Sequence, residues 1–542
     1  MPSRLITNNF LDLTEVLSIK ILSYLEAVHI ARCAMTCKSI YRTVSNSPQL
    51  EYIILLHLNG FKDSGQSATI PFSVLVTRLR QLRQTYLNPK FRLNGSVQMQ
   101  GSSFGFDLAG DMFVINTGRS LECAKVPIGN GVSETWPDAQ IRIRNFTLDY
   151  SQNLIVMVED DDEQPELSRH DPREMSIYLH DKNGQHPQAP FHSLQFTITP
   201  DGCWGNVLRS SFLQVSGKFL AHYYYTVDEQ GDSQARVMIW DWQMSARLVD
   251  STLLSPPLLP TRGSFFHLLN SSYFLVLSDL NSGSIHLHAL VQSRKRRGTW
   301  TTSVAHLATL QLPRTARGVE VYHPFTTHTA SRSGKPFYDK RLLESNPDDD
   351  LHVFTLTYYD DRHDAVPLDA YDCEVRPSID LFVHRRIFTK YCKIGEKASN
   401  RPVVVPWEDW GPANTRIIYP SRTQTWTPGL HDIHGQRAIL QKVKLRHEFA
   451  ESNEIEVLDF SEAAIMAAKR GETPGKLLPP TRIRTSDVRL FNHEVSTRLP
   501  CVAYPVTFQQ DYAQYMIHEF GVLGLRMTHS LLPMIRVDSY LF

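Results

Sequence analysis

The sequence lacks an excess of charge of either sign, because 56 lysine and arginine residues are balanced by 56 aspartate and glutamate residues. A balanced chain has no global field that attracts nucleic acid or anionic lipid. The sequence also lacks any apolar run near the roughly 20 residues that a membrane helix needs, and its first residues hold no apolar signal core. We therefore expect no nucleic-acid partner, no membrane association and a cytoplasmic or nuclear location.

Motifs that carry chemistry are missing as well. The seven cysteines are scattered, and only Cys33 and Cys37 lie close together, without the second pair that a zinc site needs. There is no glycine-rich phosphate loop, no HExxH and no Gly-x-Ser-x-Gly. His286 and His288 are close, but two histidines do not make a metal site. The sequence thus predicts no catalytic residue, no cofactor and no metal, and its thiols are expected to be reduced.

What the first sixty residues do hold is helical patterning. Asp12 is expected to cap a helix, with Glu15 three residues later completing a capping box. Leu17, Ile21 and Leu25 then repeat at helical spacing on one face. Two more short amphipathic helices are predicted near Ile30 and Ile40, the second of them closed by the polar run that ends at Pro48.

So small a unit has too much surface to bury all of its apolar faces internally. Leu17, Ile21 and Leu25 must therefore contact something else. Two interpretations stand side by side at this point. These side chains face another protein, or they pack against the rest of the chain.

The same residues resemble a known family. The segment from Leu13 to Leu25, followed by Met35-Thr36-Cys37-Lys38-Ser39, resembles an F-box, the helical motif by which substrate receptors bind the Skp-type adaptor of a cullin ubiquitin ligase. The continuation around Leu50 and Phe61 is similar to F-box proteins of mushroom-type fungi. The resemblance implies adaptor contact through a set of apolar residues: Leu13, Val16, Leu17, Ile21, Leu25 and Met35.

The segment departs from the F-box pattern at two places. F-boxes usually begin with Leu-Pro, where this chain has Asp12 and Leu13. The loss of proline in a first turn should cost little, since its advantage there is a preset φ and a missing, unneeded donor. The tryptophan that often ends the motif is replaced, with Leu50 near its place. Either departure puts part of the adaptor contact in question.

Beyond this module, residues 72–87 are predicted to form a helix, and from residue 93 the pattern changes to short strands cut by turns. We divide the chain into a three-helix module (1–60), a linker helix (61–92) and a mainly-β domain (93–542). The linker helix is expected to couple the module to the β domain. The fold class is therefore multidomain, with a small all-α module ahead of a large β domain.

A strand of recurring form indicates how the β domain is built. It alternates apolar residues and ends in a polar one, and it is centred on Ile177, Met238, Ile285, Phe382 and Val457. Repeats of this size suggest a degenerate β-propeller with long inserted loops. The run that ends in Trp240-Asp241 is similar to a WD-type blade. The longest gap, between Ile285 and Phe382, leaves room for an undetected repeat. Paired β-sandwiches are the alternative architecture.

Two segments are candidates for target binding. Trp407 and Trp410, bracketed by prolines, predict a rigid aromatic turn, which either closes a blade or serves as a recognition loop. The basic cluster that includes Arg296 and Arg297 is a solvated loop, a nuclear import signal or a contact for phosphate, which arginine binds in bidentate fashion.

The leading hypothesis is a non-enzymatic substrate-recognition subunit of a cullin-type (SCF) ubiquitin ligase. Its F-box would bind a Skp-type adaptor, and through it a cullin scaffold, while the β domain would bind a protein target whose identity the sequence does not give. The first alternative is a non-ligase propeller scaffold whose helical module packs internally. A hydrolase or lyase that uses a propeller channel would need a cluster of acids and histidines that the sequence does not display.

Overall fold

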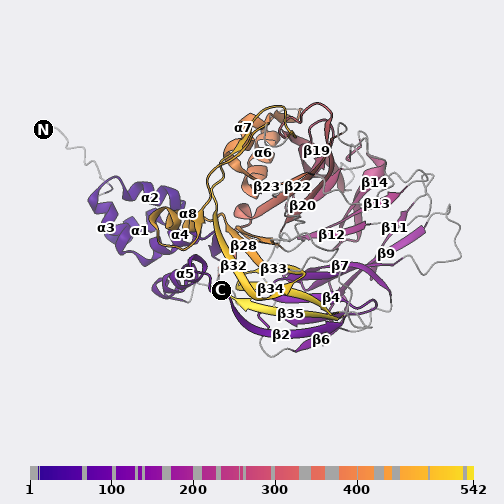
Figure 1. Cartoon of the computed structure of the whole chain (residues 1–542), viewed down its shortest axis with the longest axis horizontal. Coiled ribbons are helices and arrows are strands. Elements are labelled where there is room, and N and C mark those ends of the chain that lie inside the picture. The colour runs from indigo at the N-terminus through magenta and orange to yellow at the C-terminus, as the bar shows by residue number, and fades with distance from the viewer. Residues whose placement is uncertain are drawn as a thin grey trace.

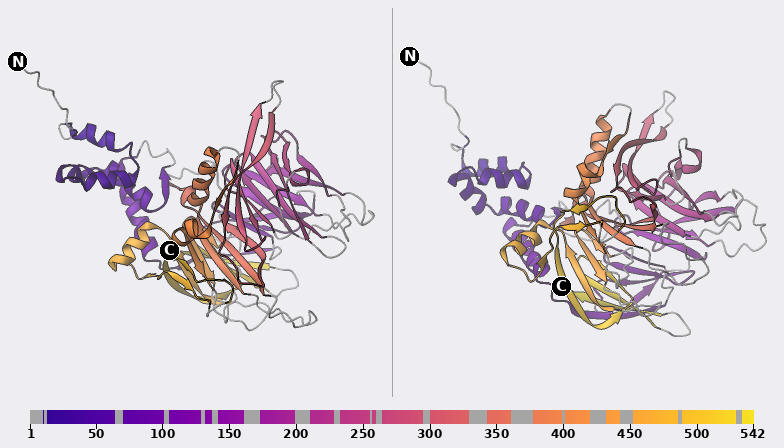
Figure 2. Two further views of the ribbon diagram at one scale, coloured as in Figure 1. Left: turned by 90° about the horizontal axis from the view of Figure 1, so that it is seen from above. Right: turned by 45° about the horizontal axis from the view of Figure 1, so that its top comes forward.

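The structure is a computed structural model of the whole chain. It describes residues 10, 13–63, 70–100, 105–128, 132–136, 141–160, 173–198, 210–227, 233–254, 257–259, 264–294, 300–328, 343–360, 377–398, 401–419, 432–441, 452–485, 489–528 and 534–542. Within these ranges a group of N-terminal helices projects from one side of a large β domain (Figure 1). The same separation is visible in both views of Figure 2.

The N-terminal module contains four short helices rather than three. They are α1 (Glu15–Leu22), α2 (Ala27–Ala34), α3 (Lys38–Asn46) and α4 (Pro48–Leu58). Pro48, which was expected to close the helical region, instead begins α4, where its missing amide donor is not needed. The hydroxyl of Ser47 caps this helix by accepting a hydrogen bond of 3.4 Å from the Leu50 amide.

A small core holds the four helices together. Leu22, Ile30, Val44 and Leu50, one from each helix, are buried against one another. A second cluster joins α4 to the longer helix α5 (Phe72–Leu87) through Tyr52, Leu55, Leu56, Leu75, Val76 and Leu79. The helix predicted at residues 72–87 is therefore present, and its N-terminal part packs against the module.

The β domain is a seven-bladed β-propeller, because seven of the sheets among the described residues have four or five strands each and form its blades. Blade 1 contains β3 (Phe106–Ala109), β4 (Met112–Asn116), β5 (Leu121–Lys125) and β6 (Ser133–Thr135). Blade 2 contains β7 (Ile143–Asp149), β8 (Leu154–Glu159), β9 (Arg173–Asp181) and β11 (Ser193–Ile198), with β10 (Gly184–Gln185) beside β9. Blade 3 contains β12 (Ser210–Ser216), β13 (Phe219–Val227), β14 (Ser233–Asp241) and β15 (Ala246–Asp250), which leads into the 3-10 turn η4 (Ser251–Leu253).

The remaining blades follow the same antiparallel order. Blade 4 contains β16 (Phe265–Leu268), β17 (Tyr273–Ser278), β18 (Ser284–Arg294) and β19 (Trp300–Gln311). Blade 5 contains β20 (Val319–His328), β22 (Leu351–Asp360), β23 (Ser378–His384) and β25 (Thr415–Ile418). Blade 6 contains β26 (Ile433–His434), β27 (Arg437–Gln441), β28 (Ser452–Asp459) and β32 (Val502–Tyr512). Blade 7 contains β33 (Gln514–His518), β34 (Gly521–Thr528), β35 (Met534–Leu541) and β2 (Arg92–Gln100).

Blade 7 closes the ring with strands from both ends of the β domain. Strand β2 pairs antiparallel with β35, and Val97 stands opposite Val537. Closing a ring in this way leaves no open end at which the sheets could separate one after another. The seven blades exclude the alternative of paired β-sandwiches.

The recurring strand found in the sequence is the third strand of five successive blades. Ile177, Met238, Ile285, Phe382 and Val457 lie in β9, β14, β18, β23 and β28. The expectation of an undetected repeat between Ile285 and Phe382 is wrong, since β18 and β23 belong to consecutive blades. The gap is long because β18 and β19 form an extended hairpin and because blade 5 carries insertions.

The insertions lie between strands of blades 5 and 6. Blade 5 carries β21 (Leu343–Ser345) and η5 (Pro347–Asp349) before β22, and α6 (Arg385–Lys397), β24 (Val403–Val405) and α7 (Trp407–Asn414) before β25. Blade 6 carries α8 (Glu462–Arg470), β29 (Lys476–Leu477), β30 (Thr481–Ile483) and β31 (Val495–Thr497) before β32. In an antiparallel blade the first-to-second and the third-to-fourth connections emerge on the same side. We call this side of the ring the insertion face.

Candidate partner-binding surfaces

Helix α1 begins later than the sequence suggested. Its N-cap residue is Thr14, which makes no side-chain capping bond, and the helix starts at Glu15. Asp12 lies outside the described residues, and Glu15, as the first helical residue, is not in the capping-box position that we assigned to it. An acid in the first turn still interacts favourably with the helix dipole.

The apolar residues of the helical module fall into two sets. Leu22 and Ile30 are 3% and 0% exposed and belong to the small core. Leu17 and Ile21, on the same helix as Leu22, keep 48% and 45% of their surface exposed. Periodicity alone does not separate these sets, because only the packing of α1 on its neighbours determines which of its apolar faces is covered.

The exposed set forms what we call the module surface. It consists of the exposed apolar residues of the module: Val16, Leu17, Ile21, Tyr24, Leu25, Val28, Met35 and Tyr41. Five of the six residues expected to contact an adaptor belong to it, and the sixth, Leu13, is partly buried. Tyr24, Val28 and Tyr41 were not singled out from the sequence. Their only signal there was their position next to the predicted set.

Helix α5 connects the module to the propeller through its C-terminal end. The hydroxyl of Tyr86 donates a 2.8 Å hydrogen bond to the carbonyl oxygen of Glu519. The guanidinium of Arg437 lies 3.3 Å from the centre of the Tyr86 ring, and Arg437 Nε is 2.9 Å from a carboxylate oxygen of Asp459. Leu87 is buried in the core of blades 6 and 7. A helix with both of its ends packed holds the module in a fixed orientation.

The charges at this contact support each other. Burial by itself would lower the pKa of Arg437, but the nearby Asp459 carboxylate raises it, so the pKa stands above its ordinary value. Burial raises the pKa of Tyr86 to about 12, although the positive charge of Arg437 acts in the opposite direction. The tyrosine is therefore neutral and the arginine charged at physiological pH. No sequence pattern predicts this contact, because its members are far apart in the chain.

A short sheet makes a second connection on the insertion face. Strand β1 (Phe61–Asp63) pairs antiparallel with β21 of blade 5. The amide of Asn346 donates a 2.7 Å hydrogen bond to the carbonyl oxygen of Gly60. Gly60 has φ 69°, a left-handed backbone conformation that favours glycine, and an added Cβ would displace the side chain of Gln436. Two separate connections thus fix the module on blades 5, 6 and 7.

Trp407 and Trp410 do not lie at the surface. They are 4% and 0% exposed, begin helix α7 instead of forming a turn, and meet edge to face with ring centres 5.3 Å apart. The indole N–H of Trp410 donates a 2.8 Å hydrogen bond to the carbonyl oxygen of Gln311 in blade 4. Both rings pack between the helical insertion of blade 5 and blade 4, so neither is available to a target.

The other candidate segment lies elsewhere. Arg296 and Arg297 follow β18 in the sequence and lie outside the described residues. His286 and His288 are in β18, where His306 of β19 joins them, with His286 Nδ1 3.4 Å from His306 Nε2. Burial and the neighbouring His306 lower the pKa of His286 to about 4, so these rings are neutral at physiological pH.

Two further findings concern metals and membranes. In the described part of the chain, no group of three or more histidine, cysteine, aspartate or glutamate side chains is arranged to hold a metal ion. None of the helices among the described residues has both the length and the apolar character that crossing a bilayer requires.

Comparison with known proteins adds to this picture. No curated protein matches the chain significantly. Among solved structures, an uncharacterised protein from Listeria monocytogenes is 10% identical with a TM-score of 0.25, covering 69% of this chain and 96% of that one. The tricorn protease is 9% identical with a TM-score of 0.30, covering 78% of this chain and 36% of that one. An α-L-arabinanase from Penicillium chrysogenum is 7% identical with a TM-score of 0.23, covering 66% and 94%.

The N-terminal module has a match of its own. The family model for the F-box domain matches residues 10–51, which include α1, α2 and α3 and the start of α4. All eight residues of the module surface lie within the matched residues. The chain therefore carries an F-box domain, followed by a seven-bladed β-propeller.

Proposed function

We propose that this protein is the substrate-recognition subunit of a cullin-type (SCF) ubiquitin ligase. Its F-box domain binds a Skp-type adaptor, which connects it to the cullin scaffold, and its propeller binds the target. The protein is not itself an enzyme, because other subunits carry out ubiquitin transfer, and it contributes to the rate by positioning the target. The proposal places it in the cytoplasm or the nucleus.

The observation that carries the proposal is the module surface. Soluble domains rarely expose a contiguous group of large apolar side chains unless that group is a binding site. Here Val16 and Met35, both within the residues that match the F-box model, are 75% and 79% exposed. The module already has its own core in Leu22 and Ile30, so the exposed residues are not needed to hold it together.

The alternative scaffold function required that the helical module pack internally or on the propeller. The residues in question are only partly covered, since Leu17, Ile21 and Leu25 remain 48%, 45% and 37% exposed. The contacts between module and propeller instead run through α5 and β1, which leave this surface uncovered. The same two connections support the positioning role, because a target held by the propeller would stay at a fixed distance from the adaptor.

The proposal is tested by co-expression of the full chain with a Skp-type adaptor, followed by affinity purification through the chain and size-exclusion chromatography. We expect the two proteins to elute together in equal amounts, and we expect addition of a cullin to shift the complex to a larger size. A full chain that elutes as a folded protein separate from the adaptor would contradict the proposal.

A further inference from the structure

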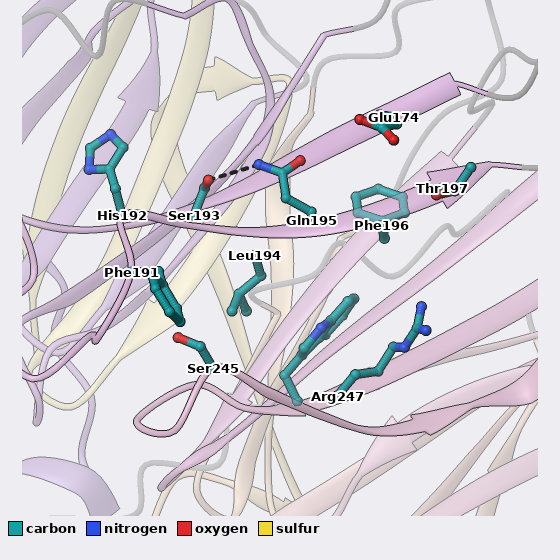
Figure 3. A pocket seen from close by; sticks show the side chains of 11 residues that line it. Glu174, Phe191, His192, Ser193, Leu194, Gln195, Phe196, Thr197, Ser245 and Arg247 are labelled. Atoms are coloured by element: carbon teal, nitrogen blue, oxygen red, sulfur yellow. Dashed lines mark hydrogen bonds between the residues drawn. The ribbon is translucent and has the colours of Figure 1, made fainter.

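A groove lies between blades 2 and 3, far from the F-box domain. Its volume is about 870 Å3. One wall is β11, the outer strand of blade 2, and the other is the hairpin of β14 and β15 in blade 3 (Figure 3). Five successive residues of β11, from Ser193 to Thr197, line it. A groove lined by successive residues of one strand runs along that strand.

The edge of β11 offers backbone groups to this groove. Within the described ranges β11 pairs with β9 alone. The carbonyl oxygen of His192 accepts a 3.1 Å hydrogen bond from the Leu179 amide of β9. In an antiparallel ladder the direction of the backbone groups alternates, so Ser193, Gln195 and Thr197 direct their N–H and C=O groups away from β9. Such an edge is a template for a further strand.

The side chains of the groove give it an apolar floor and a polar wall. Leu194, Phe196 and Trp240 are 3%, 2% and 2% exposed and form the floor, while Phe191 stands at the rim with 65% of its surface exposed. In Figure 3 the hydroxyl of Ser245 points towards Phe191 and Leu194. This hydroxyl is buried and has no hydrogen-bond partner among the described residues.

The charge at the wall is positive. Arg247 of β15 lines the groove, and 46% of its side chain is exposed. The guanidinium of Arg247 lies 3.4 Å from the carboxylate of Asp250. This ion pair uses only part of the five N–H donors of the arginine. Glu174 also lines the groove, but it belongs to β9, on the far side of β11 from the free edge. An acidic group at the free edge would therefore meet Arg247.

We propose that this groove binds an extended peptide segment of the target, added as a strand to the free edge of β11. One of its side chains is apolar and lies over Leu194, Phe196 and Trp240, and another is an aspartate or glutamate that pairs with Arg247. This inference rests on the proposed function, because it names the surface by which the receptor holds its target. The backbone supplies affinity, and the alternating side chains supply specificity.

The test uses the full chain and a library of end-blocked octapeptides, randomised at every position and immobilised on beads. We expect selection of peptides that alternate apolar and polar residues, with an aspartate or glutamate at one fixed position. Their affinity is then measured by fluorescence anisotropy. Failure to select any peptide, or selection of peptides without an acidic position, would overturn the inference.

Two variants with matched controls examine the binding mode. Gln195→Pro removes an edge amide that does not bond to β9, and the selected peptides should bind it at least about tenfold more weakly. Gln195→Ala keeps that amide and should therefore lose much less affinity than Gln195→Pro, so the difference between the two variants measures the contribution of the edge amide. Arg247→Glu should weaken binding by about tenfold, and a peptide with lysine in place of its acid should recover the loss. Equal binding by the natural chain, Gln195→Pro and Arg247→Glu would refute strand addition at β11.

These experiments need no adaptor, so their outcome is separate from that of the F-box test. A chain that binds peptides but no adaptor would retain the groove and lose the ligase function. A chain that binds the adaptor but no peptide in the library would retain the F-box function and refute the groove as the target site.

Discussion

Replacement of Leu17 and Ile21 by aspartate tests the module surface directly. Both side chains are about half exposed, at 48% and 45%. A fully buried leucine or isoleucine contributes about 1.5–3 kcal/mol, so each half-buried side chain contributes about 1 kcal/mol to the fold. The double variant Leu17→Asp/Ile21→Asp should thus lose about 2 kcal/mol of module stability and none of the stability of the propeller.

The effect on adaptor binding should be larger. Burial of the exposed half of each side chain contributes about 1 kcal/mol to binding, and an aspartate forced into the interface adds a desolvation cost of at least about 1 kcal/mol. The two substitutions together should lower the free energy of adaptor binding by about 4 kcal/mol, which corresponds to an increase of about a thousandfold in Kd. We expect the double variant to lose the adaptor in co-purification and to show no measurable heat in calorimetric titration.

The chain offers an internal reporter and a control for this experiment. All eight tryptophans lie beyond residue 100, so their fluorescence reports the folding of the propeller and not of the module. Leu253→Asp places the same charge at a residue of η4 that is 75% exposed, and it should leave adaptor binding unchanged. Undiminished adaptor affinity in a folded double variant would refute the assignment of the surface. A large shift in the tryptophan unfolding transition would show instead that Leu17 and Ile21 pack on the propeller.

Two other predictions concern buried charges of the propeller. Arg437→Met should lower the free energy of unfolding by about 3–5 kcal/mol, because Asp459 would be left buried without its partner, and the double variant with Asp459→Asn should recover much of that loss in denaturant titrations. Burial raises the pKa of Asp380 from 3.8 to about 7, although a hydrogen bond from Thr355 lowers it. The folded state therefore binds a proton more tightly than the unfolded state, and the stability due to this group is lost as the pH rises from about 4 through about 7. Asp380→Asn should remove that dependence and add up to about 4 kcal/mol at pH 8, and identical pH profiles of the two proteins would contradict this reasoning.

The sequence revealed most of the architecture where local patterns are strong. The third strands of blades 2 to 6 carry the alternation that indicated a propeller. The third strands of the other two blades were missed. In blade 1 this strand is the short β5, and in blade 7 it is β35, where Arg536 interrupts the apolar residues. The number of blades therefore did not follow from the pattern. Helix α4 was missed because Pro48 marks a helix start as readily as a helix end.

The candidate sites were harder to predict, since they depend on how elements pack. Leu17 and Leu22 are the same residue type on one helix, yet only Leu22 is buried. Trp407 and Trp410 have the composition of a recognition loop, but packing between two blades buries them. The groove beside β11 combines residues of two blades and has no linear motif. The F-box was thus identified by its resemblance to a known family, and sequence patterns could not identify the surface of the propeller.

The arrangement of the connections relates the two proposed surfaces. The module is attached on the insertion face at blades 5 and 6, through β21 and α8. The groove includes Phe191 and His192 of the third-to-fourth connection of blade 2 and Ser245 of the corresponding turn of blade 3, so one end of it opens on the same face. In Figure 1 β9 and β11 lie across the ring from the helices. A peptide in the groove would thus be held at the insertion face, one propeller width from the F-box domain. Because α5 and β1 both fix the module, that separation would be set by the fold and would not vary with a flexible linker.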